Sequence, residues 1–397
     1  MSDDGASRSV RRGGTVLLTL GRLPKALDVA RALHSAGWRV IVAEPARRHL
    51  TGASRSVARS VVVASPVTDA IGYLEQLRAL IVEEAVDLVV PISEEILHVA
   101  GLRDRLPSGV RLQAMPQAAL LALHDKHSFV ERCAAAGVLA PPTAALGTAM
   151  AEQLVAEGPV VVKPVFSCSG RGVSFLPRGA ALPMREEPSI VQRRCDGRLL
   201  STFSIARRGE LRLTVTYRGA VMQGTVAVCF ERLDTPPLLE AWVRRLVGHE
   251  RFDGFISFDF IESLEGTIWG IECNPRATSG LHFVEPADLA RALLEPDDDA
   301  PLRLRPERLQ QQFYPCLTET QKSVFGGPLR ENFRCLVQAR DVTASWRDPW
   351  PFVSMPWTAW PIIEQSIRQG CTFGEVAMSD LVWTGRPVAG AGKAGVE

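Results

Sequence analysis

The sequence lacks several patterns that would define a function class at once. No two of its cysteines lie closer than Cys316 and Cys335, so there is no CxxC pair and no zinc-ligand spacing. The turn after the first predicted strand contains Gly21 but no GxGxxG, and no GxxxxGK[ST] occurs anywhere in the chain. These absences argue against zinc fingers, Rossmann-type dinucleotide binding and Walker A nucleotide binding.

Neither charge nor hydrophobicity is concentrated in long blocks. The chain has 45 Lys and Arg against 44 Asp and Glu, a net charge of +1, so we expect no nucleic-acid partner. The apolar stretch 79–92 is broken by Glu83, Glu84 and Asp87, and no run reaches membrane-spanning length, so we expect no membrane partner. Residues 1–14 are polar, resemble no signal peptide and are expected to form a disordered leader. The eight cysteines sit mostly among apolar neighbours, which favours reduced thiols and a cytoplasmic protein.

The first part of the chain alternates between strand and helix patterns. Apolar runs predict strands, and segments with helical spacing lie between them. The predicted strands are 15–20, 39–43, 61–63 and 87–91, and the predicted helices are 24–36 and 71–84. Strands separated by helices predict a parallel, doubly wound sheet, an α/β arrangement.

The pattern changes after residue 118. A helix is predicted over 125–136, then strands 160–165 and 173–176, with strands and hairpins dominating up to residue 274, an α+β arrangement. Beyond residue 290 the chain is predicted to be helical over 309–321. It then becomes an irregular, Pro-rich stretch that holds five of the eight tryptophans.

Three polar residues follow the strand predicted at 87–91. Ligands of doubly wound sheets bind beyond the carboxyl ends of strands, so Ser93, Glu94 and Glu95 are candidates for substrate contact. The alternative is that they cap and begin the next helix. We favour the capping role for Ser93 and leave both roles open for Glu94 and Glu95.

Lys163 lies inside an apolar strand, where an unpaired ammonium would be costly. The loop 167–172, Ser-Cys-Ser-Gly-Arg-Gly, follows it. Its glycines allow backbone N–H groups to turn toward an anion, and its serines add hydroxyl donors. The alternative is an ordinary hairpin with a lysine paired to a local carboxylate. The lysine and the loop together favour phosphate binding.

A second group of polar residues lies on a predicted hairpin. The apolar runs 255–261 and 267–273 flank a turn, and a turn centred between Glu265 and Gly266 places Asp259 opposite Glu272. Asn274 shares the face of Glu272. Two facing carboxylates repel unless a cation lies between them, and hard oxygen ligands suit Mg²⁺. The alternative is a solvated polar face on an edge hairpin.

The order of these motifs resembles the ATP-grasp superfamily. It runs from Asp125-Lys126 through Val162-Lys163-Pro164 and the Ser/Gly loop to Asp259-Phe260-Ile261 and Ile271-Glu272-Cys273-Asn274-Pro275-Arg276. The resemblance spans about residues 15–286. It implies an N-terminal doubly wound domain (15–118) and an ATP-grasp domain (119–293) with a small lid (about 139–191) and a larger antiparallel sheet. A C-terminal extension (294–397) follows.

The resemblance also implies roles for individual residues. Lys163 and Arg276 would act in catalysis. Asp259, Glu272 and Asn274 would bind Mg²⁺, with Mn²⁺ as an alternative. The nucleotide would contact Lys126, Lys163, Ser167, Ser169, Gly170, Arg171, Gly172, Gln192, Arg193 and Cys195. Relatives commonly carry a Glu shortly after the hinge glycine, where this chain reads Gly197-Arg198-Leu199.

The function that the resemblance implies is ATP-dependent ligation of a carboxylate to an amine through an acyl phosphate. Such an enzyme would use ATP and small-molecule acid and amine substrates, and it could form a homodimer. The substrates are expected near Glu94, Glu95, Ser279, Gly280 and His282. His124 and His127, beside Lys126, are expected on the helix surface. The alternatives are an ATP-grasp phosphotransferase, a carbamoyl-phosphate-type enzyme, and a non-catalytic nucleotide-binding protein.

Overall fold

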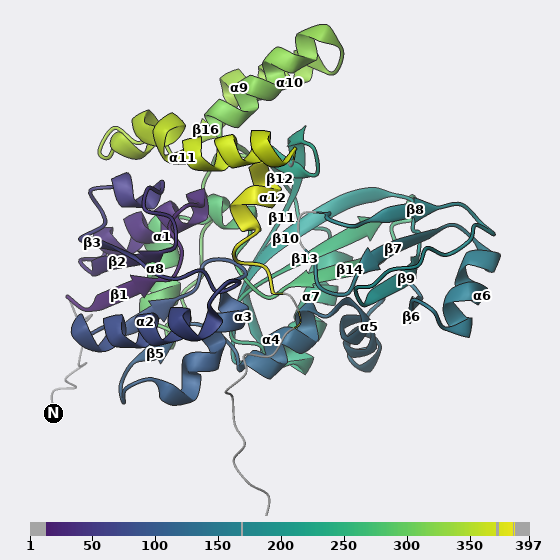
Figure 1. Cartoon of the computed structure of the whole chain (residues 1–397), viewed down its shortest axis with the longest axis horizontal. Helices are drawn as coiled ribbons and strands as arrows, with labels where there is room; N and C mark the ends of the chain where they lie inside the picture. Colours follow the sequence, from purple (N-terminus) through teal and green to yellow (C-terminus); the bar gives the residue numbers. More distant parts are fainter. Residues whose placement is uncertain (1–12, 168–169, 371–372, 384, 386–397) are drawn as a thin grey trace, which may run out of the picture.

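Three β-sheets organise the computed structural model, which describes residues 13–167, 170–370, 373–383 and 385. In Figure 1 the N-terminal sheet lies on the left, the long central sheet in the middle and the small third sheet on the right. The predicted leader 1–14 lies outside the described residues except for Gly13 and Gly14. No described helix is long and apolar enough to cross a membrane.

The N-terminal sheet is parallel and has the strand order β3-β2-β1-β4-β5. Its elements are β1 (Thr15–Leu18), α1 (Pro24–Ser35), β2 (Arg39–Glu44), β3 (Arg59–Val62), α2 (Ala70–Glu83), β4 (Leu88–Val90) and β5 (Arg111–Leu112). Helices separate the strands, as the alternating pattern predicts. The chain order reverses between β1 and β4, so the carboxyl ends of these two strands form the switch point where such sheets bind ligands.

The small sheet is antiparallel and has the order β6-β9-β7-β8. It consists of β6 (Thr143–Ala145), β7 (Val160–Pro164), β8 (Ser174–Leu176) and β9 (Ser189–Arg193), with α6 (Ala149–Glu157) packed against it. Lys163 lies on β7, in the middle of this sheet. The sheet falls within the segment predicted to form a lid.

The central sheet has seven strands in the order β14-β13-β10-β11-β12-β15-β16. Its long strands are β10 (Arg198–Arg207), β11 (Glu210–Gln223), β12 (Val226–Leu233), β13 (Gly254–Glu262) and β14 (Ile268–Asn274). Helices α4 (Gln117–His124), α5 (Lys126–Ala135) and α7 (Pro237–His249) bury apolar side chains against it. Trp242 of α7 approaches the sheet so closely that a Cβ on Gly270 would lie 2.4 Å from its ring.

The C-terminal segment differs from the prediction in two places. Residues 309–311 form β15 (Leu309–Gln311), which pairs with β12, and only then does α9 (Phe313–Lys322) begin. The expected irregular stretch contains α11 (Trp350–Gln369), a 20-residue helix with two internal prolines. The other elements are α10 (Leu329–Gln338) and β16 (Arg340–Asp341). Three buried free cysteines, Cys229, Cys316 and Cys335, join α9 and α10 to β12.

A strap formed by residues 373–383 returns from these helices to the N-terminal sheet. It begins with α12 (Phe373–Met378) and buries Leu381 and Trp383 in two different hydrophobic clusters. Met378 Sδ lies 3.9 Å from Ser93 Oγ, and Ser65 Oγ donates a hydrogen bond of 3.0 Å to the Asp380 carbonyl. The strap therefore covers the carboxyl ends of β1 and β4.

Arg22, in the loop after β1, connects the strap to the N-terminal sheet through ion pairs. Arg22 donates from Nη1 and Nη2 to Asp380, at 2.7 and 2.9 Å, and from Nε to Glu44 at 2.8 Å. The Glu44 side chain is fully buried and that of Arg22 is 7% exposed. The ion pair therefore lies in a low-dielectric setting, where removing one partner leaves an uncompensated charge.

We expect Arg22→Ala to lower the free energy of unfolding by about 3–5 kcal/mol, because Glu44 would stay buried without its cation. Urea denaturation followed by circular dichroism measures this change. Arg59→Ala is the control, because the Arg59 pairs with Glu83 and Glu84 involve an exposed guanidinium and its loss should leave the curve nearly unchanged. Superimposable curves for Arg22→Ala and the native protein would contradict the expectation.

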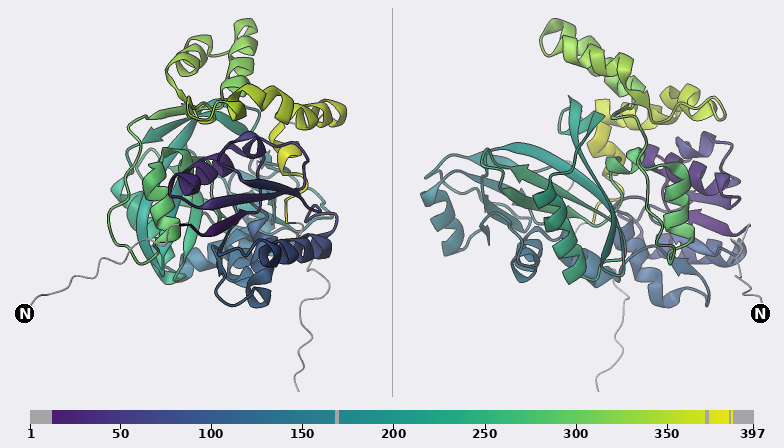
Figure 2. Two further views of the ribbon diagram at one scale, coloured as in Figure 1. Left: turned by 90° about the vertical axis from the view of Figure 1, so that its left-hand side faces the viewer. Right: turned by 180° about the vertical axis from the view of Figure 1, so that it is seen from behind.

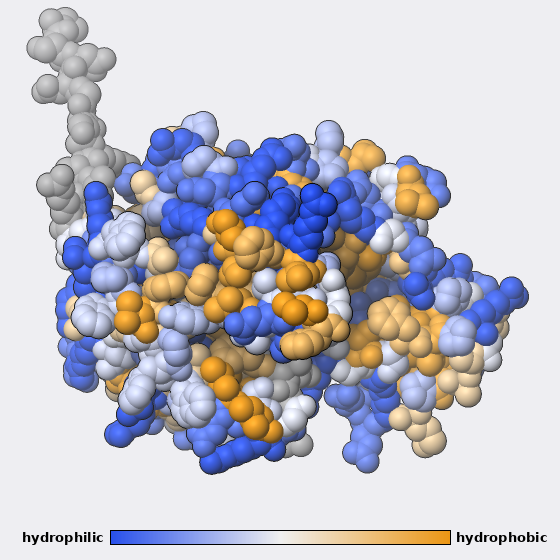
Figure 3. Space-filling model, turned by 90° about the horizontal axis from the view of Figure 1, so that it is seen from above, coloured by the Kyte–Doolittle hydropathy of each residue, from blue (hydrophilic) through white to orange (hydrophobic). Residues whose placement is uncertain are grey.

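The C-terminal helices carry an exposed apolar face. Among the residues that the structure describes, 23 large hydrophobic residues are exposed, and 11 of them lie between residues 324 and 367. On α11, the exposed side chains of Trp350, Val353, Trp357 and Trp360 recur every three or four residues, so they share one side of the helix. Figure 2 shows α9 and α10 projecting from the body at this end, and Figure 3 looks onto the same end, where apolar residues gather.

Candidate active site

The predicted hairpin forms and contains the predicted pair, although next to the turn the strands pair one residue out of the predicted register, as in Glu262 with Ile268. Asp259 on β13 pairs directly with Glu272 on β14, and Ser257 pairs with Asn274. Residues that oppose each other in this way have Cβ atoms about 5 Å apart on one face of the sheet. The hairpin therefore brings two carboxylates together.

A β-bulge beside this pair creates a binding position for Lys163. The register shifts between Asp259 and Phe260, whose partners are Glu272 and Gly270, so Ile271 has no partner residue. Its carbonyl accepts a hydrogen bond of 3.0 Å from Lys163 Nζ. The bulge thus holds the lysine of the small sheet against the edge of the central sheet.

Two buried lysines converge on Glu272. Lys126 Nζ lies 3.7 Å from Glu272 Oε2 and donates a 3.0 Å hydrogen bond to the carbonyl of Ser167. Burial lowers the pKa of Lys163 to about 8, with Glu272 opposing the shift and Lys126 adding to it. Burial also raises the pKa of Glu272, but the charges of Lys126 and Lys163 outweigh it and hold this pKa below its usual value. The pair of cations is suited to bind an anion with more charge than one carboxylate.

The pKa of Asp259, the carboxyl group paired with Glu272, is shifted in the opposite direction. Burial and the charge of Glu272 raise the pKa of Asp259 to about 6, although Ser201 Oγ donates a 2.6 Å hydrogen bond to it. A divalent cation between the two carboxylates would remove this repulsion, and two carboxylates with an amide oxygen form a donor set that fits Mg²⁺. No group of three His, Cys, Asp or Glu side chains in the described chain could hold a metal ion, so a ligand set here needs the Asn274 amide.

Asn274 links the carboxylates to an arginine. Its Nδ2 donates to Asp259 Oδ2 at 3.3 Å, and its Oδ1 accepts from Arg276 Nη2 at 3.0 Å. The same Arg276 Nη2 lies 3.3 Å from Glu94 Oε1. A continuous series of polar groups therefore runs from the carboxylate pair to the carboxyl end of β4.

The Ser/Gly loop has the backbone conformation that its glycines predict. Gly170 and Gly172 both have φ of +72°, in the left-handed region, and both are exposed, as is Arg171. A Cβ on Gly172 would lie 2.8 Å from Pro164. Ser167 is buried, and its carbonyl accepts the hydrogen bond from Lys126 Nζ. The predicted contact at Ser169 falls outside the described residues.

Two of the predicted hinge residues, Gln192 and Arg193, end β9, and the third, Cys195, follows it. Gln192 is buried, and its Nε2 donates to Thr143 Oγ1 at 2.9 Å, which ties β9 to β6. The backbone N–H of Arg193 donates to the Pro142 carbonyl at 2.8 Å, and its side chain pairs with Glu157. Cys195 is a half-buried free thiol beyond the strand. Gln192 Nε2 and the backbone N–H of Arg193 thus have partners in or next to the small sheet, and the nucleotide role of both residues stays a prediction.

Four of the five predicted substrate residues lie in structural positions. The Glu95 carboxylate accepts hydrogen bonds from Thr19 Oγ1 and from the backbone N–H groups of Ile92 and Ser93, so it caps the turn after β4. His282 Nδ1 lies 2.8 Å from Asp28 Oδ2 of α1, and both are buried. Gly280 is packed so tightly that a Cβ would lie 2.5 Å from Phe203, and Ser279 precedes it in the same short helix, Ser279–Phe283. Only Glu94 contacts the predicted catalytic group.

Two residues of this region were not predicted as parts of the site. Ser201 has no sequence signal beyond its place on a strand, because its partner Asp259 lies 58 residues away. His124 was expected on the surface but is 1% exposed, and its Nε2 lies 3.7 Å from Glu94 Oε1. The surface prediction holds for His127 and is wrong for His124, which ends α4 against the central sheet.

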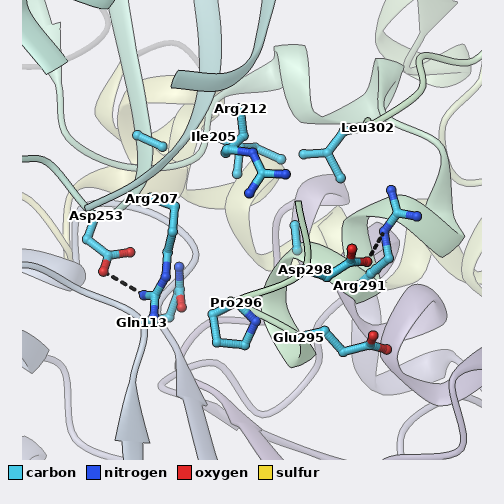
Figure 4. Close-up of a pocket in the computed structure, with 12 residues that line it drawn as sticks. Gln113, Ile205, Arg207, Arg212, Asp253, Arg291, Glu295, Pro296, Asp298 and Leu302 are labelled. Carbon is cyan, nitrogen blue, oxygen red and sulfur yellow. Dashed lines mark hydrogen bonds and ion pairs between the residues drawn. The ribbon is translucent and has the colours of Figure 1, made fainter. Parts of the chain in front are cut away.

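The pocket in Figure 4 lies apart from these residues, where β10, β11 and α8 (Pro286–Leu294) meet. Its arginines are already paired: Arg207 with Asp253, Arg291 with Asp298, and Arg212 with Asp299. The charges that line this pocket therefore neutralise each other, in contrast to those of the carboxylate and lysine cluster.

Several solved structures share the fold. N5-carboxyaminoimidazole synthetase from Staphylococcus aureus has a TM-score of 0.58 and 13% identity, over 74% of this chain and 80% of its own. The biotin carboxylase domain dimer of 2-oxoglutarate carboxylase from Hydrogenobacter thermophilus, solved with MgADP, ADP and bicarbonate, has a TM-score of 0.58 and 16% identity, over 73% and 70%. L-amino acid ligase from Bacillus licheniformis has a TM-score of 0.52 and 14% identity, over 72% and 71%. No protein-family model and no curated protein matches the sequence.

Proposed function

Because the chain has the ATP-grasp fold, we propose that it is an ATP-dependent ligase that joins a carboxylic acid to an amine. The acid is activated as an acyl phosphate, and the products are an amide, ADP and phosphate. The observation that carries the proposal is the convergence of Lys126 and Lys163 on the paired carboxylates of Asp259 and Glu272, with Arg276 adjoining. The three cations suit the phosphates of a nucleoside triphosphate, and the two carboxylates suit its metal ion.

The proposed roles follow from charge and position. Lys126 and Lys163 bind the phosphates of ATP, and the loop at Ser167 and Gly170–Gly172 covers them. Asp259, Glu272 and Asn274 hold Mg²⁺, which when bound neutralises charge on the transferred phosphoryl group. Arg276 holds the acyl phosphate, because its forked donors suit phosphate oxygens. The hinge at Gln192, Arg193 and Cys195 lies where the adenine is expected.

The solved structures support the general kind of reaction. One of them is an amino acid ligase and another is a carboxylase domain crystallised with MgADP. All share this fold at 13–16% identity, so the acid and the amine used by this chain must be found by experiment. A cytoplasmic location is part of the proposal and is supported by the six described cysteines, which are free thiols.

The test is an assay of nucleotide products with MgATP, pooled carboxylic acids and pooled amines. We expect ADP and phosphate only when both pools are present, and splitting the pools then identifies the substrates. Release of AMP and pyrophosphate would show instead that the acid is activated as an acyl adenylate. A phosphorylated product formed without any amine would identify a phosphotransferase.

We also propose that the protein forms a homodimer through the exposed face of α11. Trp350, Val353, Trp357 and Trp360 are 58–65% exposed, and at aromatic side-chain sizes they present on the order of 500 Å² of apolar surface. A patch of that size is at the upper end of what a typical monomer exposes, about 300–600 Å², and would supply more than half of the ~800 Å² that each partner buries in a stable complex. A second copy supplies a matching apolar face by symmetry.

We expect Trp350→Ser combined with Trp360→Ser to convert the dimer to a monomer. Removing two interfacial aromatic side chains costs about 3–6 kcal/mol, which raises the dissociation constant by more than about 100-fold. Light scattering coupled to gel filtration gives the mass directly. Leu238→Ser is the control, because this side chain on α7 is equally exposed but lies outside the face. A monomeric native protein at micromolar concentration would contradict the proposal.

A further inference from the structure

Glu94 ends the series of polar groups that starts at the carboxylate pair. It follows β4 at the switch point of the N-terminal sheet and is fully buried. Its Oε1 lies 3.3 Å from Arg276 Nη2 and 3.7 Å from His124 Nε2. Glu94 is therefore the residue through which the N-terminal sheet reaches the proposed acyl-phosphate position.

One of the two carboxylate oxygens of Glu94 has no hydrogen-bond partner in the described chain. Oε2 of Glu94 is buried and accepts no hydrogen bond from any described residue, and His124 Nε2 is buried without a hydrogen bond as well. A buried polar group without a partner costs about 1–3 kcal/mol, so such groups are rare unless a ligand or ordered water completes them. Two of them on adjacent side chains, both at least 95% buried, indicate a position that a ligand fills.

The protonation states of the histidines beside Glu94 indicate which kind of ligand would bind there. Burial lowers the pKa of His124 below its usual value, and burial lowers that of His98, one helical turn after Glu94, to about 4. The imidazoles are therefore neutral at pH 7. The Nδ1 of His124 faces the carbonyl oxygen of Cys273 and so carries the proton, which leaves Nε2 as an acceptor. Glu94 Oε2 and His124 Nε2 are thus two acceptors, a set that fits an amine.

The surroundings shield the position from water. The ring of Trp383 on the strap packs on His98 with a centroid separation of 4.8 Å, and Met378 adjoins Ser93. On the other side, the ring of His124 lies 6.0 Å from Phe166, at the start of the Ser/Gly loop. Exclusion of water protects an acyl phosphate from hydrolysis.

We propose that Glu94, assisted by His124, forms the subsite for the amine substrate and takes its proton. This inference rests on the proposed ligase function. The amine nitrogen donates hydrogen bonds to Glu94 Oε2 and His124 Nε2 and attacks the carbonyl carbon of the acyl phosphate. The C–N bond forms, the C–O bond to phosphate breaks, phosphate leaves with its electron pair, and the proton lost by the nitrogen passes to the Glu94 carboxylate.

Hydroxylamine separates this role from a purely structural one. At high concentration it traps an acyl phosphate as a hydroxamate without requiring a positioned base, because it is nucleophilic at neutral pH. We expect Glu94→Gln to retain acid-dependent ADP and hydroxamate formation within about threefold. With the amine substrate we expect amide formation to fall by about 100-fold or more, the usual contribution of a general base, and the KM for the amine to rise.

His124→Asn provides an independent second variant. An asparagine amide can keep the contact that His124 Nδ1 makes with the Cys273 carbonyl, and it removes Nε2. We expect the same selective loss of amide formation, and no change for the surface control Glu131→Gln.

The possible outcomes separate the two proposals. Parallel losses of hydroxamate and amide in Glu94→Gln would show that Glu94 only positions Arg276, and would overturn the subsite. An unchanged amide rate and amine KM in both variants would also overturn it. If the native protein forms neither ADP nor hydroxamate with any acid, the ligase function itself fails, and the subsite fails with it.

Discussion

Replacing Glu272 by Gln is expected to abolish ADP formation, with a loss of about a thousandfold or more. The substitution keeps the size of the side chain and removes the charge that pairs with Asp259 across the hairpin and faces Lys126. A metal ion at a phosphoryl-transfer site contributes several kcal/mol to the barrier, and each 1.36 kcal/mol corresponds to a factor of ten. The variant should keep its fold, because the backbone ladder of β13 and β14 is untouched.

The measurement is the initial rate of ADP release with saturating acid and amine, together with a thermal melt. Glu262→Gln is the matched control, because this glutamate ends the same hairpin and pairs with Arg198 on the neighbouring strand. We expect it to retain the native rate. Native-like turnover by Glu272→Gln would remove the metal assignment.

Lys163→Met is the second substitution with a large expected effect. Methionine fills the same space on β7, but it removes the cation that the bulge at Ile271 holds in place. The loss of one preorganised group that stabilises developing charge costs about 10²–10³ in kcat. Lys322→Met, at an exposed lysine on α9, should leave the rate unchanged.

The Lys163→Met substitution is expected to lower activity without lowering stability. Burial lowers the pKa of Lys163 from its usual value of 10.5 to about 8 in the folded protein. The unfolded state therefore binds more protons between these values, so the native protein gains stability as the pH rises from 8 to 10.5. Without nucleotide or metal, Lys163→Met should be at least as stable as the native protein at pH 7 and should lack that gain. A variant that is both inactive and clearly less stable at pH 7 would contradict this account of Lys163.

The local parts of the site could be predicted from the sequence. The apolar runs and the short turn predict the hairpin, and with it the approach of Asp259 and Glu272, although the exact pair depends on a β-bulge that shifts the register by one residue. The positive φ angles of Gly170 and Gly172 likewise follow from residue type. These features depend on neighbours in the chain or on a short hairpin.

Contacts between distant segments left no pattern in the sequence. Arg276 and Glu94 are 182 residues apart, and the burial of His124 depends on how α4 packs on the central sheet. The bulge that frees the Ile271 carbonyl is a property of the paired strands and has no marker in β14 alone. Sequence periodicity describes one element at a time, so it predicted the elements and missed these contacts.

Two errors in the C-terminal segment have physical causes. Leu309–Gln311 is too short to show strand alternation and runs into α9 with one intervening residue, so the whole stretch has a helical pattern. Prolines at 356 and 361 argue against a helix, because each removes a backbone donor. The helix persists because Met355 packs against Leu27 and Leu50 of the N-terminal domain, a tertiary contact that outweighs local propensity.

The most direct test of the ligase proposal follows the oxygen atoms of the acid. Once the acid is identified, its carboxylate is labelled with ¹⁸O and the enzyme is run with MgATP and the amine. An acyl phosphate transfers one carboxylate oxygen to the released phosphate, so mass spectrometry should find one ¹⁸O in each inorganic phosphate formed. Unlabelled phosphate, or label recovered in AMP, would contradict the central claim. That claim is that the acid is activated by the terminal phosphate of an ATP molecule bound by Lys126, Lys163 and the Asp259–Glu272 pair.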